Sequence, residues 1–288
     1  MQSVLGIAVV AVGLLLAALL AVGIIDGNRF EVVKEEFFLS GLSQKCRFVL
    51  ISDLHNQVYG NKNEKLIHTI KNINPDFIVV AGDLVTSEEK EDMTPGIELI
   101  QILSRDYKIY YGLGNHESKI KNCPERFGNQ YHFLKSSLTN KNVCLLENES
   151  VEIPKYNIQI TGLELDLKYF AHFRKCAMKQ GYLQQMIAKP IKDKCNLLIA
   201  HNPDYFEEYA QWGADLVVSG HVHGGIMKLP FLGGVLAPSL RIFPKYDGGV
   251  YKEGKTVMLL GRGLGSHTIK LRFFNPAQLY EVTLKPKL

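Results

Sequence analysis

Seven residues of the types that bind transition metals occur in five short clusters along the 288-residue chain. These candidate ligands are Asp53, His55, Asp83, Asn115, His201, His221 and His223. Their side chains offer carboxylate, amide and imidazole atoms without a thiolate, a set that suits Mn, Fe or Zn better than Ca or Mg. A lone histidine is usually structural, but a metal site requires several clusters to converge. The sequence therefore predicts a site for divalent metal ions.

Asp83 is the candidate ligand that two ions would share. Two cations about 3.5–4 Å apart repel each other, and a bridging carboxylate relieves that repulsion. In segments 53–55 and 221–223 the candidate ligands are two positions apart, so both side chains of each pair lie on one side if the backbone stays extended. Glycines on either side of 221–223 would let the backbone turn tightly there. We therefore expect two ions.

Each cluster directly follows a short run of β-branched or aromatic residues, which predicts a buried strand. The predicted strands are 47–51, 77–81, 109–113, 196–200 and 216–219. Between them, segments 64–73, 97–103 and 203–212 have helical spacing, so strands and helices alternate as in βαβ units. Ligands in such sheets bind at the carboxyl ends of the strands, where all five clusters are expected.

Later runs at 156–162, 256–261, 269–274 and 279–284 lack intervening helices and predict antiparallel strands. Together with the βαβ part they indicate two sheets packed face to face. No repeat, low-complexity tract or long linker divides residues 27–288, so we expect one catalytic domain behind an N-terminal segment, residues 1–26.

Residues 4–25 form an uncharged apolar run, long enough for a helix that crosses about 30 Å of hydrocarbon. No basic residue precedes the run, which favours an uncleaved single-pass anchor over a signal peptide, although Ala21-Val22-Gly23 leaves cleavage open. Arg29 and Lys34 follow the helix and lean towards a cytoplasmic catalytic domain, but acidic residues lie among them. The side of the cell membrane on which the catalytic domain lies stays undecided.

The formal net charge of +4 is mild and does not by itself indicate nucleic acid, which we disfavour as a partner. Segment 168–194 concentrates lysine and arginine among aromatic residues. It predicts a solvated helix face with an apolar underside, or alternatively a surface that meets anionic lipid. The five cysteines are widely spaced without a CxxC pair, so they indicate neither a disulfide framework nor a cysteine zinc site. The sequence indicates no oligomeric state.

In order, the motifs D-x-H, GD, GNH-[DE], a lone His and G-H-x-H resemble those of the calcineurin-like metallophosphoesterase superfamily. Segments 52–55, 200–203, 220–225 and 263–265, with the apolar N-terminus, are similar to its bacterial membrane-associated branch. The resemblance implies an α/β/β/α sandwich with two mixed sheets. It also implies two ligand sets: Asp53, His55, Asp83 and His223 for one metal, and Asp83, Asn115, His201 and His221 for the other.

The resemblance further implies a catalytic role for His116, which would stabilise the transition state and protonate the leaving oxygen. Many members carry GDxxD, whose second aspartate orients that histidine. Here Thr86 stands in its place and offers only a hydroxyl, while Glu117 is an alternative orienting residue.

The predicted reaction is hydrolysis of a phosphate ester or anhydride, in which a hydroxide bridging both metals attacks phosphorus in line and His116 assists. The sequence does not separate phosphomonoesterase, phosphodiesterase, nuclease and pyrophosphatase, although the lack of a long basic channel disfavours a nuclease. Two alternatives stay open: a lipid-linked nucleotide pyrophosphatase, and a catalytically weak metal-binding scaffold at the membrane. The apolar loop 227–232 would shape an acyl groove beside the metals, or would pack internally.

Overall fold

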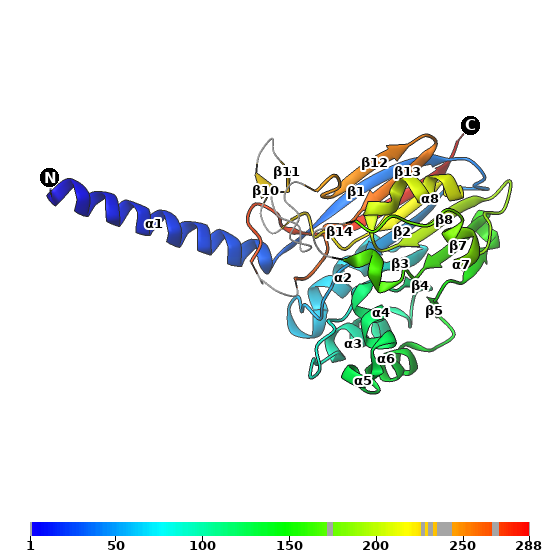
Figure 1. Cartoon of the computed structure of the whole chain (residues 1–288), viewed down its shortest axis with the longest axis horizontal. Helices are drawn as coiled ribbons and strands as arrows, with labels where there is room; N and C mark the ends of the chain where they lie inside the picture. Colours follow the sequence, from blue (N-terminus) through cyan, green and yellow to red (C-terminus); the bar gives the residue numbers. More distant parts are fainter. Residues whose placement is uncertain are drawn as a thin grey trace.

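The computed structural model describes residues 2–171, 175–225, 228–229, 233–234, 244–266 and 271–287. Two six-stranded mixed sheets pack face to face, with helices on both outer faces (Figure 1). This four-layer arrangement confirms the α/β/β/α sandwich predicted from the sequence. The sandwich positions every candidate site residue at strand ends.

The first sheet has the order β1-β14-β2-β3-β4-β5. Its strands are β1 (Phe30–Leu39), β14 (Ala277–Pro286), β2 (Cys46–Ile51), β3 (Phe77–Ala81), β4 (Ile109–Gly112) and β5 (Val143–Leu146). Strands β2 to β5 run parallel, β14 runs antiparallel to β2, and β1 runs parallel to β14. This sheet carries the first three clusters.

The second sheet has the order β12-β13-β9-β8-β7-β6. Its strands are β12 (Gly249–Glu253), β13 (Thr256–Leu260), β9 (Leu216–Ser219), β8 (Cys195–Ala200), β7 (Ile158–Leu163) and β6 (Ser150–Ile153). The four central strands are parallel and the two edge strands antiparallel. A separate small hairpin joins β10 (Lys228–Leu229) to β11 (Gly233–Gly234).

Helices cover the outer face of each sheet. The first sheet is covered by α2 (Glu64–Ile73), α3 (Thr94–Leu103), α4 (Asn115–Asn122), α5 (Pro124–Phe127) and α6 (Gln130–Leu138), with the 3₁₀ turn η1 (Asn61–Asn63). The second sheet is covered by α7 (Tyr182–Met186) and α8 (Phe206–Trp212). Three further 3₁₀ turns among the described residues are η2 (Pro154–Tyr156), η3 (Leu167–Phe170) and η4 (Pro203–Tyr205).

Strand β2 shows why these segments form a sandwich. Phe48 and Leu50 pack between the two sheets, whereas Val49 and Ile51 pack against the helices. Successive side chains of a strand point to opposite faces, so a strand buried on both faces needs an uninterrupted apolar run. The same pattern in β3, β8 and β9 explains why the sequence predicted these strands to within about a residue.

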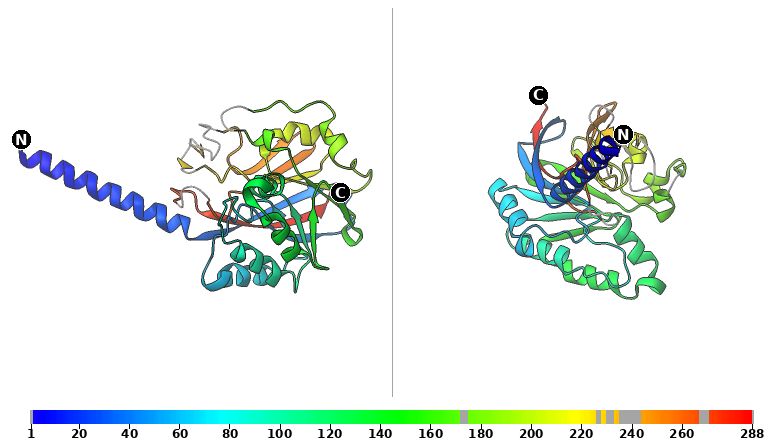
Figure 2. Two further views of the ribbon diagram at one scale, coloured as in Figure 1. Left: turned by 60° about the horizontal axis from the view of Figure 1, so that its bottom comes forward. Right: turned by 90° about the vertical axis from the view of Figure 1, so that its left-hand side faces the viewer.

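Helix α1 (Gln2–Gly27) projects away from the sandwich as a single rod (Figures 1 and 2). Its segment Gly6–Gly27 is long and apolar enough, by length and composition, to cross a membrane. The strand that follows α1 begins at Phe30, which pairs with Ala277 at the start of β14. Because β14 is antiparallel to β2, pairing Tyr280 with Leu50, α1 joins the domain at the edge where β2 ends.

Two predicted elements are wrong. Within segment 269–274, the described residues 271–274 are not a strand: they form a loop with a single bridge residue at Phe273. Segment 168–194 is not one helix face, since its described residues form η3, a loop and the short helix α7. Tyr169 in this segment is 3% exposed and packs against Tyr182 and Tyr205, so its ring is core rather than a lipid-facing surface.

Most of the loop assigned to an acyl groove, 227–232, lies outside the described residues. Only the backbone of β10 is described there. The groove therefore stays a prediction.

Candidate metal centre

All seven candidate ligands lie at the carboxyl ends of five strands, as predicted. Asp53 and His55 follow β2, Asp83 follows β3, and Asn115 begins α4 after β4. The remaining three, His201 after β8 and His221 with His223 after β9, come from the second sheet. The two sheets thus contribute to one site at their shared edge.

The backbone at the ligands differs from the extended form expected from the i, i+2 spacing, and that expectation is wrong. Asp53 and His55 have φ of 49° and 47°, and His221 and His223 have φ of 78° and 57°. Asp83 is likewise left-handed at 52°. Such angles are uncommon for residues with a Cβ and cluster at functional sites. The side chains of each pair converge through tight turns at the strand ends, rather than through strand pleating.

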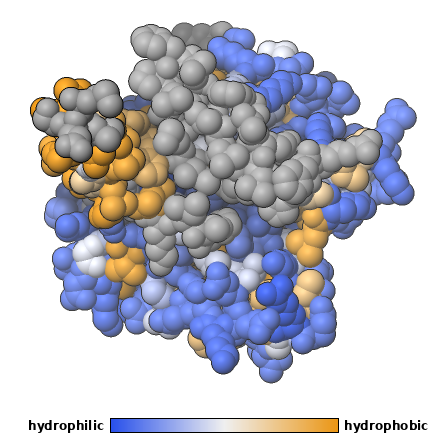
Figure 3. Space-filling model, turned by 60° about the vertical axis from the view of Figure 1, so that its left-hand side comes forward, coloured by the Kyte–Doolittle hydropathy of each residue, from blue (hydrophilic) through white to orange (hydrophobic). Residues whose placement is uncertain are grey.

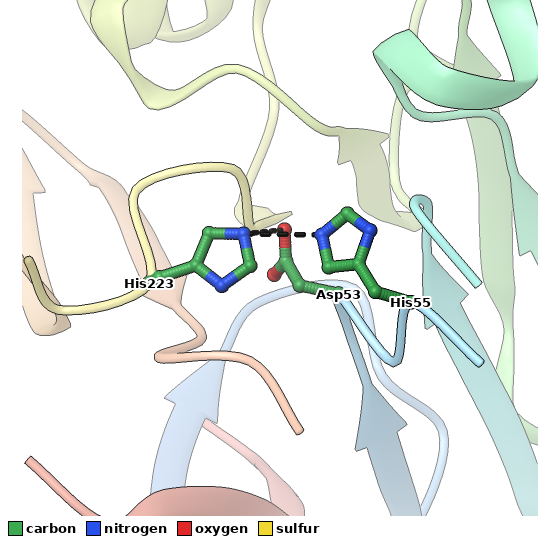
Figure 4. A group of neighbouring side chains, drawn as sticks. All are labelled: Asp53, His55 and His223. Carbon is green, nitrogen blue, oxygen red and sulfur yellow. Dashed lines mark hydrogen bonds and ion pairs between the residues drawn. The ribbon is translucent and has the colours of Figure 1, made fainter. Parts of the chain in front are cut away.

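Asp53, His55 and His223 form the first cluster, with ligand atoms all within 4.8 Å of one another. Their side chains point towards one another from two loops: Asp53 and His55 lie on the loop after β2, and His223 lies on the loop after β9 (Figure 4). Nε2 of His223 lies 3.5 Å from Oδ1 of Asp53 and 3.2 Å from Nε2 of His55. Three ligand atoms that face one point at this spacing are suited to a shared cation.

Asp83, His201 and His221 form the second cluster, also within 4.8 Å. Oδ2 of Asp83 lies 3.0 Å from Nε2 of His201 and 3.8 Å from Nε2 of His55, which belongs to the first cluster. Asp83 therefore faces both clusters from between them, the position that a bridging carboxylate needs.

Two buried oxygen atoms at the centre support the fit to metal ions. Oδ2 of Asp53 and Oδ1 of Asn115 have no hydrogen-bond partner among the described residues. A buried polar atom without a partner costs roughly 1–3 kcal/mol, so native proteins rarely leave one unexplained. Both atoms are oxygens of the kind that coordinate divalent cations, and the donor set of the site therefore fits such ions.

The electrostatics of the cluster also call for positive charge. Burial raises the pKa of Asp53 to about 6, and the neighbouring Asp83 carboxylate adds to the rise. Burial acts on Asp83 as well, but His201 and His116 outweigh it and hold the pKa of Asp83 well below its ordinary value. Burial lowers the pKa of His201, yet the Asp83 carboxylate outweighs this and raises it to about 10. A metal ion would supply the charge that a proton on His201 otherwise provides.

Backbone carbonyls orient two of the histidines. Nδ1 of His201 donates to the Ala81 carbonyl at 2.6 Å, and Nδ1 of His223 donates to the Gly265 carbonyl at 3.0 Å. A proton held on Nδ1 leaves the lone pair of Nε2 directed at the cluster, as metal-binding histidines require.

Glu117 holds the loop that carries Asp83, a role that sequence reasoning missed. Its carboxylate accepts hydrogen bonds from the backbone amides of Asp83, Leu84 and Gly114 at 2.8–2.9 Å and from the Tyr111 hydroxyl at 2.8 Å. Gly82 has φ of +82°, and a Cβ there would lie 2.4 Å from the Gly114 amide nitrogen. The two strand-end loops are thus locked together, and Glu117 positions Asp83 rather than His116.

Ser87 occupies the place at His116 that the sequence left to Thr86 or Glu117. The backbone N–H of Ser87 donates to Nδ1 of His116 at 2.8 Å, and the Ser87 Oγ lies 2.9 Å from the same nitrogen. Because Nδ1 accepts, the imidazole proton sits on Nε2, which lies 3.9 Å from Oδ2 of Asp83. The adjacent hydroxyl in Thr86-Ser87 was the signal available in the sequence.

Known proteins are similar to this chain over the residues that form the candidate metal centre. The family model of the calcineurin-like phosphoesterase matches residues 46–225. A metallophosphoesterase of Campylobacter jejuni is 27% identical over 89% of this chain and 64% of its own length. The UDP-2,3-diacylglucosamine pyrophosphatase LpxG of Chlamydia muridarum is 25% identical over 81% of this chain and 82% of its own length.

A zebrafish transmembrane protein with a metallophosphoesterase domain is also similar, at 25% identity over 83% of this chain and 53% of its own length. This chain therefore spans about two thirds of the Campylobacter relative and about half of the zebrafish one. The family match covers the loops that carry all seven candidate ligands. The chain belongs to the calcineurin-like phosphoesterase family.

Proposed function

We propose that this protein is a membrane-anchored hydrolase of phosphate esters or anhydrides that works with two divalent metal ions. The observation that carries the proposal is the position of Asp83, whose Oδ2 lies within 4 Å of a histidine from each cluster. Asp53, His55, Asp83 and His223 would hold one ion, and Asp83, Asn115, His201 and His221 the other.

When bound, the two ions would supply Lewis-acid activation of water and of the phosphoryl oxygens. Asp53 and Asp83 hold the negative charge that retains the ions, and Glu117 and the Gly265 carbonyl keep the ligands in place. His116 presents its Nε2 proton to the same space. That proton is available to a phosphoryl oxygen or to the leaving oxygen, as general-acid assistance requires.

A phosphate at a lipid headgroup is the substrate class we favour, in particular a lipid-linked nucleotide anhydride. The supporting observation is that α1 meets the domain at the edge where β2 ends, beside the candidate ligands. Figure 3 shows apolar residues gathered on α1, while the visible surface of the domain is mostly hydrophilic. The Chlamydia relative is named for a diacylated nucleotide sugar, which agrees with this choice.

The test of the hydrolase is chelation of the full-length protein, followed by addition of Mn²⁺, Fe²⁺ or Zn²⁺. We expect hydrolysis of a nitrophenyl phosphate monoester or diester to disappear and to return, with two ions per chain by elemental analysis. Binding of both ions without turnover of any phosphate ester or anhydride would instead favour the metal-binding scaffold.

The lipid-linked substrate requires a separate measurement. We expect kcat/KM for a nucleotide anhydride in mixed micelles to rise at least roughly tenfold when the substrate carries acyl chains, because burying two methylene groups already contributes about 1.6 kcal/mol. Equal kcat/KM values with and without acyl chains would contradict the lipid-linked substrate and would favour a membrane-tethered enzyme that acts on soluble substrates.

Ser87→Ala is expected to lower kcat by a few-fold, with KM and metal content unchanged. The hydroxyl is lost, but the backbone N–H of residue 87 still donates to Nδ1 of His116, so one of the two contacts survives. Ser87→Thr should restore kcat. The matched control is Ser136→Ala on the exposed side of α6, whose kcat should equal that of the native protein. A Ser87→Ala variant that loses metal would contradict the role assigned to Ser87.

A further inference from the structure

Arg272 is a buried cation outside the predicted ligand set. Its guanidinium donates hydrogen bonds to a single loop, residues 262–266. It is 2% exposed. Nη2 donates to the Gly265 carbonyl at 2.7 Å, Nη1 to the Arg262 carbonyl at 2.8 Å, and Nε to Oγ of Ser266 at 3.3 Å. The planar fork of arginine suits several fixed acceptors at once, which lysine does not. We call residues 262–266 the Arg272-bound loop.

The Arg272-bound loop forms the back of the first cluster. Its Gly265 carbonyl accepts the Nδ1 proton of His223, and the Gly265 amide donates to the Asp53 carbonyl at 2.6 Å. The preceding amide, that of Leu264, donates to the Ser52 carbonyl at 3.0 Å. A Cβ at Gly265 would lie 1.9 Å from the Leu54 carbonyl oxygen, so the backbones are in close contact. Any shift of this loop therefore moves Asp53 and His223 together.

Arg272 also contacts the end of α1. Its backbone N–H donates to the Gly23 carbonyl at 3.1 Å. The ring of the next residue, Phe273, is so close that a Cβ on Gly23 would lie 2.7 Å from it. Gly13 lies in the same helix, but a Cβ there would meet nothing within 4 Å. The α1 end thus packs on residues 272 and 273, whereas the rest of α1 projects away from the domain.

We propose that Arg272 is a positioning residue that couples the end of α1 to the metal centre. Its guanidinium fixes the Gly265 carbonyl and thereby orients His223, while its backbone and Phe273 rest on Gly23. Helix α1 would then have two roles: it tethers the domain, and its end supports the candidate metal centre. The inference rests on the proposed metal-dependent function, because its readout is metal binding at the cluster of Asp53, His55 and His223.

The first experiment compares Arg272→Met and Arg272→Lys in the full-length protein. We expect Arg272→Met to weaken Mn²⁺ binding at one of two sites by roughly 10–100-fold, the effect usual for removing a group that orients a ligand. The Mn²⁺ affinity of Arg272→Lys should fall between that of Arg272→Met and that of the native protein. Arg47→Met is the control, since Arg47 donates to Ile73 at the opposite end of β2 and should leave Mn²⁺ affinity unchanged.

The second experiment uses the two glycines of α1 as a matched pair. Gly23→Val and Gly13→Val change the helix propensity in the same direction and add the same apolar side chain, but only the side chain at position 23 meets Phe273. We expect Gly23→Val to weaken Mn²⁺ binding and to alter the EPR spectrum of the bound Mn²⁺, with Gly13→Val equal to the native protein. Thermal unfolding in excess chelator would separate lost metal affinity from lost folding stability.

The outcomes separate a failure of the coupling from a failure of the proposed function. Native affinity in Arg272→Met, or equal affinities in the two glycine variants, would overturn the coupling while leaving the hydrolase intact. A native protein that binds no Mn²⁺ would overturn the proposed function instead. Should Arg272→Met fail to fold, the Arg272→Lys variant and the glycine pair still decide the question.

Discussion

Asp83→Asn is expected to lower kcat by roughly three orders of magnitude and to leave the protein with at most one tightly bound ion. The neutral amide removes the negative charge that faces both clusters, where Oδ2 of Asp83 lies 3.0 Å from His201 and 3.8 Å from His55. Metal-ion stabilisation of the transition state amounts to several kcal/mol, and each 1.4 kcal/mol or so is a factor of ten in rate.

Single-turnover hydrolysis and elemental analysis of the same Asp83→Asn sample would check this expectation. Asp106→Asn provides the control, because Asp106 is a half-exposed surface residue paired with Lys71 and makes the same change of charge far from the cluster. Two tightly held ions in Asp83→Asn would show that Asp83 is not the shared ligand, even if the rate fell.

His116→Gln is expected to lower kcat by about 100-fold or more while both ions remain bound. Nε2 of His116 carries the proton that we assign to the leaving or phosphoryl oxygen, and general-acid assistance contributes roughly 10²–10⁴-fold. The loss should be smaller for nitrophenyl phosphates, whose leaving group needs little protonation, than for alkyl phosphates.

The control for that variant is His132→Gln, an exposed position on α6. Metal content and the leaving-group dependence of kcat are the two measurements. Loss of ions in His116→Gln would show that His116 is a metal ligand. This outcome needs a test because the ligand atoms of His116, His55 and Asp83 lie within 4.8 Å of one another. An equal loss for all leaving groups would remove the acid role but keep an electrostatic one.

Much of this fold could be predicted from the sequence because the inner strands are buried on both faces. Val79 and Ala81 pack between the sheets while Ile78 and Val80 face the helices, so β3 has to be apolar throughout and stands out as a run. The polar residues that follow each run then lie at strand ends by necessity. The candidate ligands were visible for the same reason.

Other parts could not be predicted because they depend on backbone geometry or distant contacts. Asp and His adopt a left-handed φ more often than most residues, but side-chain type alone does not determine φ at Asp53 and His221, and the i, i+2 spacing pointed to pleating instead. Arg272 lies in a segment with strand-like composition, yet its side chain donates to carbonyls seven and ten positions earlier, contacts that the composition does not reveal. Ser87 contacts His116 partly through its backbone N–H, which any residue except proline would supply, so only its hydroxyl could be noticed in the sequence.

The pairing of β1 with β14 has a consequence for biosynthesis. Glu31 and Gln278, hydrogen-bonded across these strands, are 247 positions apart. Strand β14 separates β1 from β2, so the first sheet stays divided until β14 has emerged from the ribosome. Strand β1 is therefore synthesised long before β14, and until then it lacks the strand with which it pairs in the folded protein. Contacts of such long range slow folding and expose strand edges, which makes this interval the stage at which newly made chains are most open to chaperone capture or aggregation.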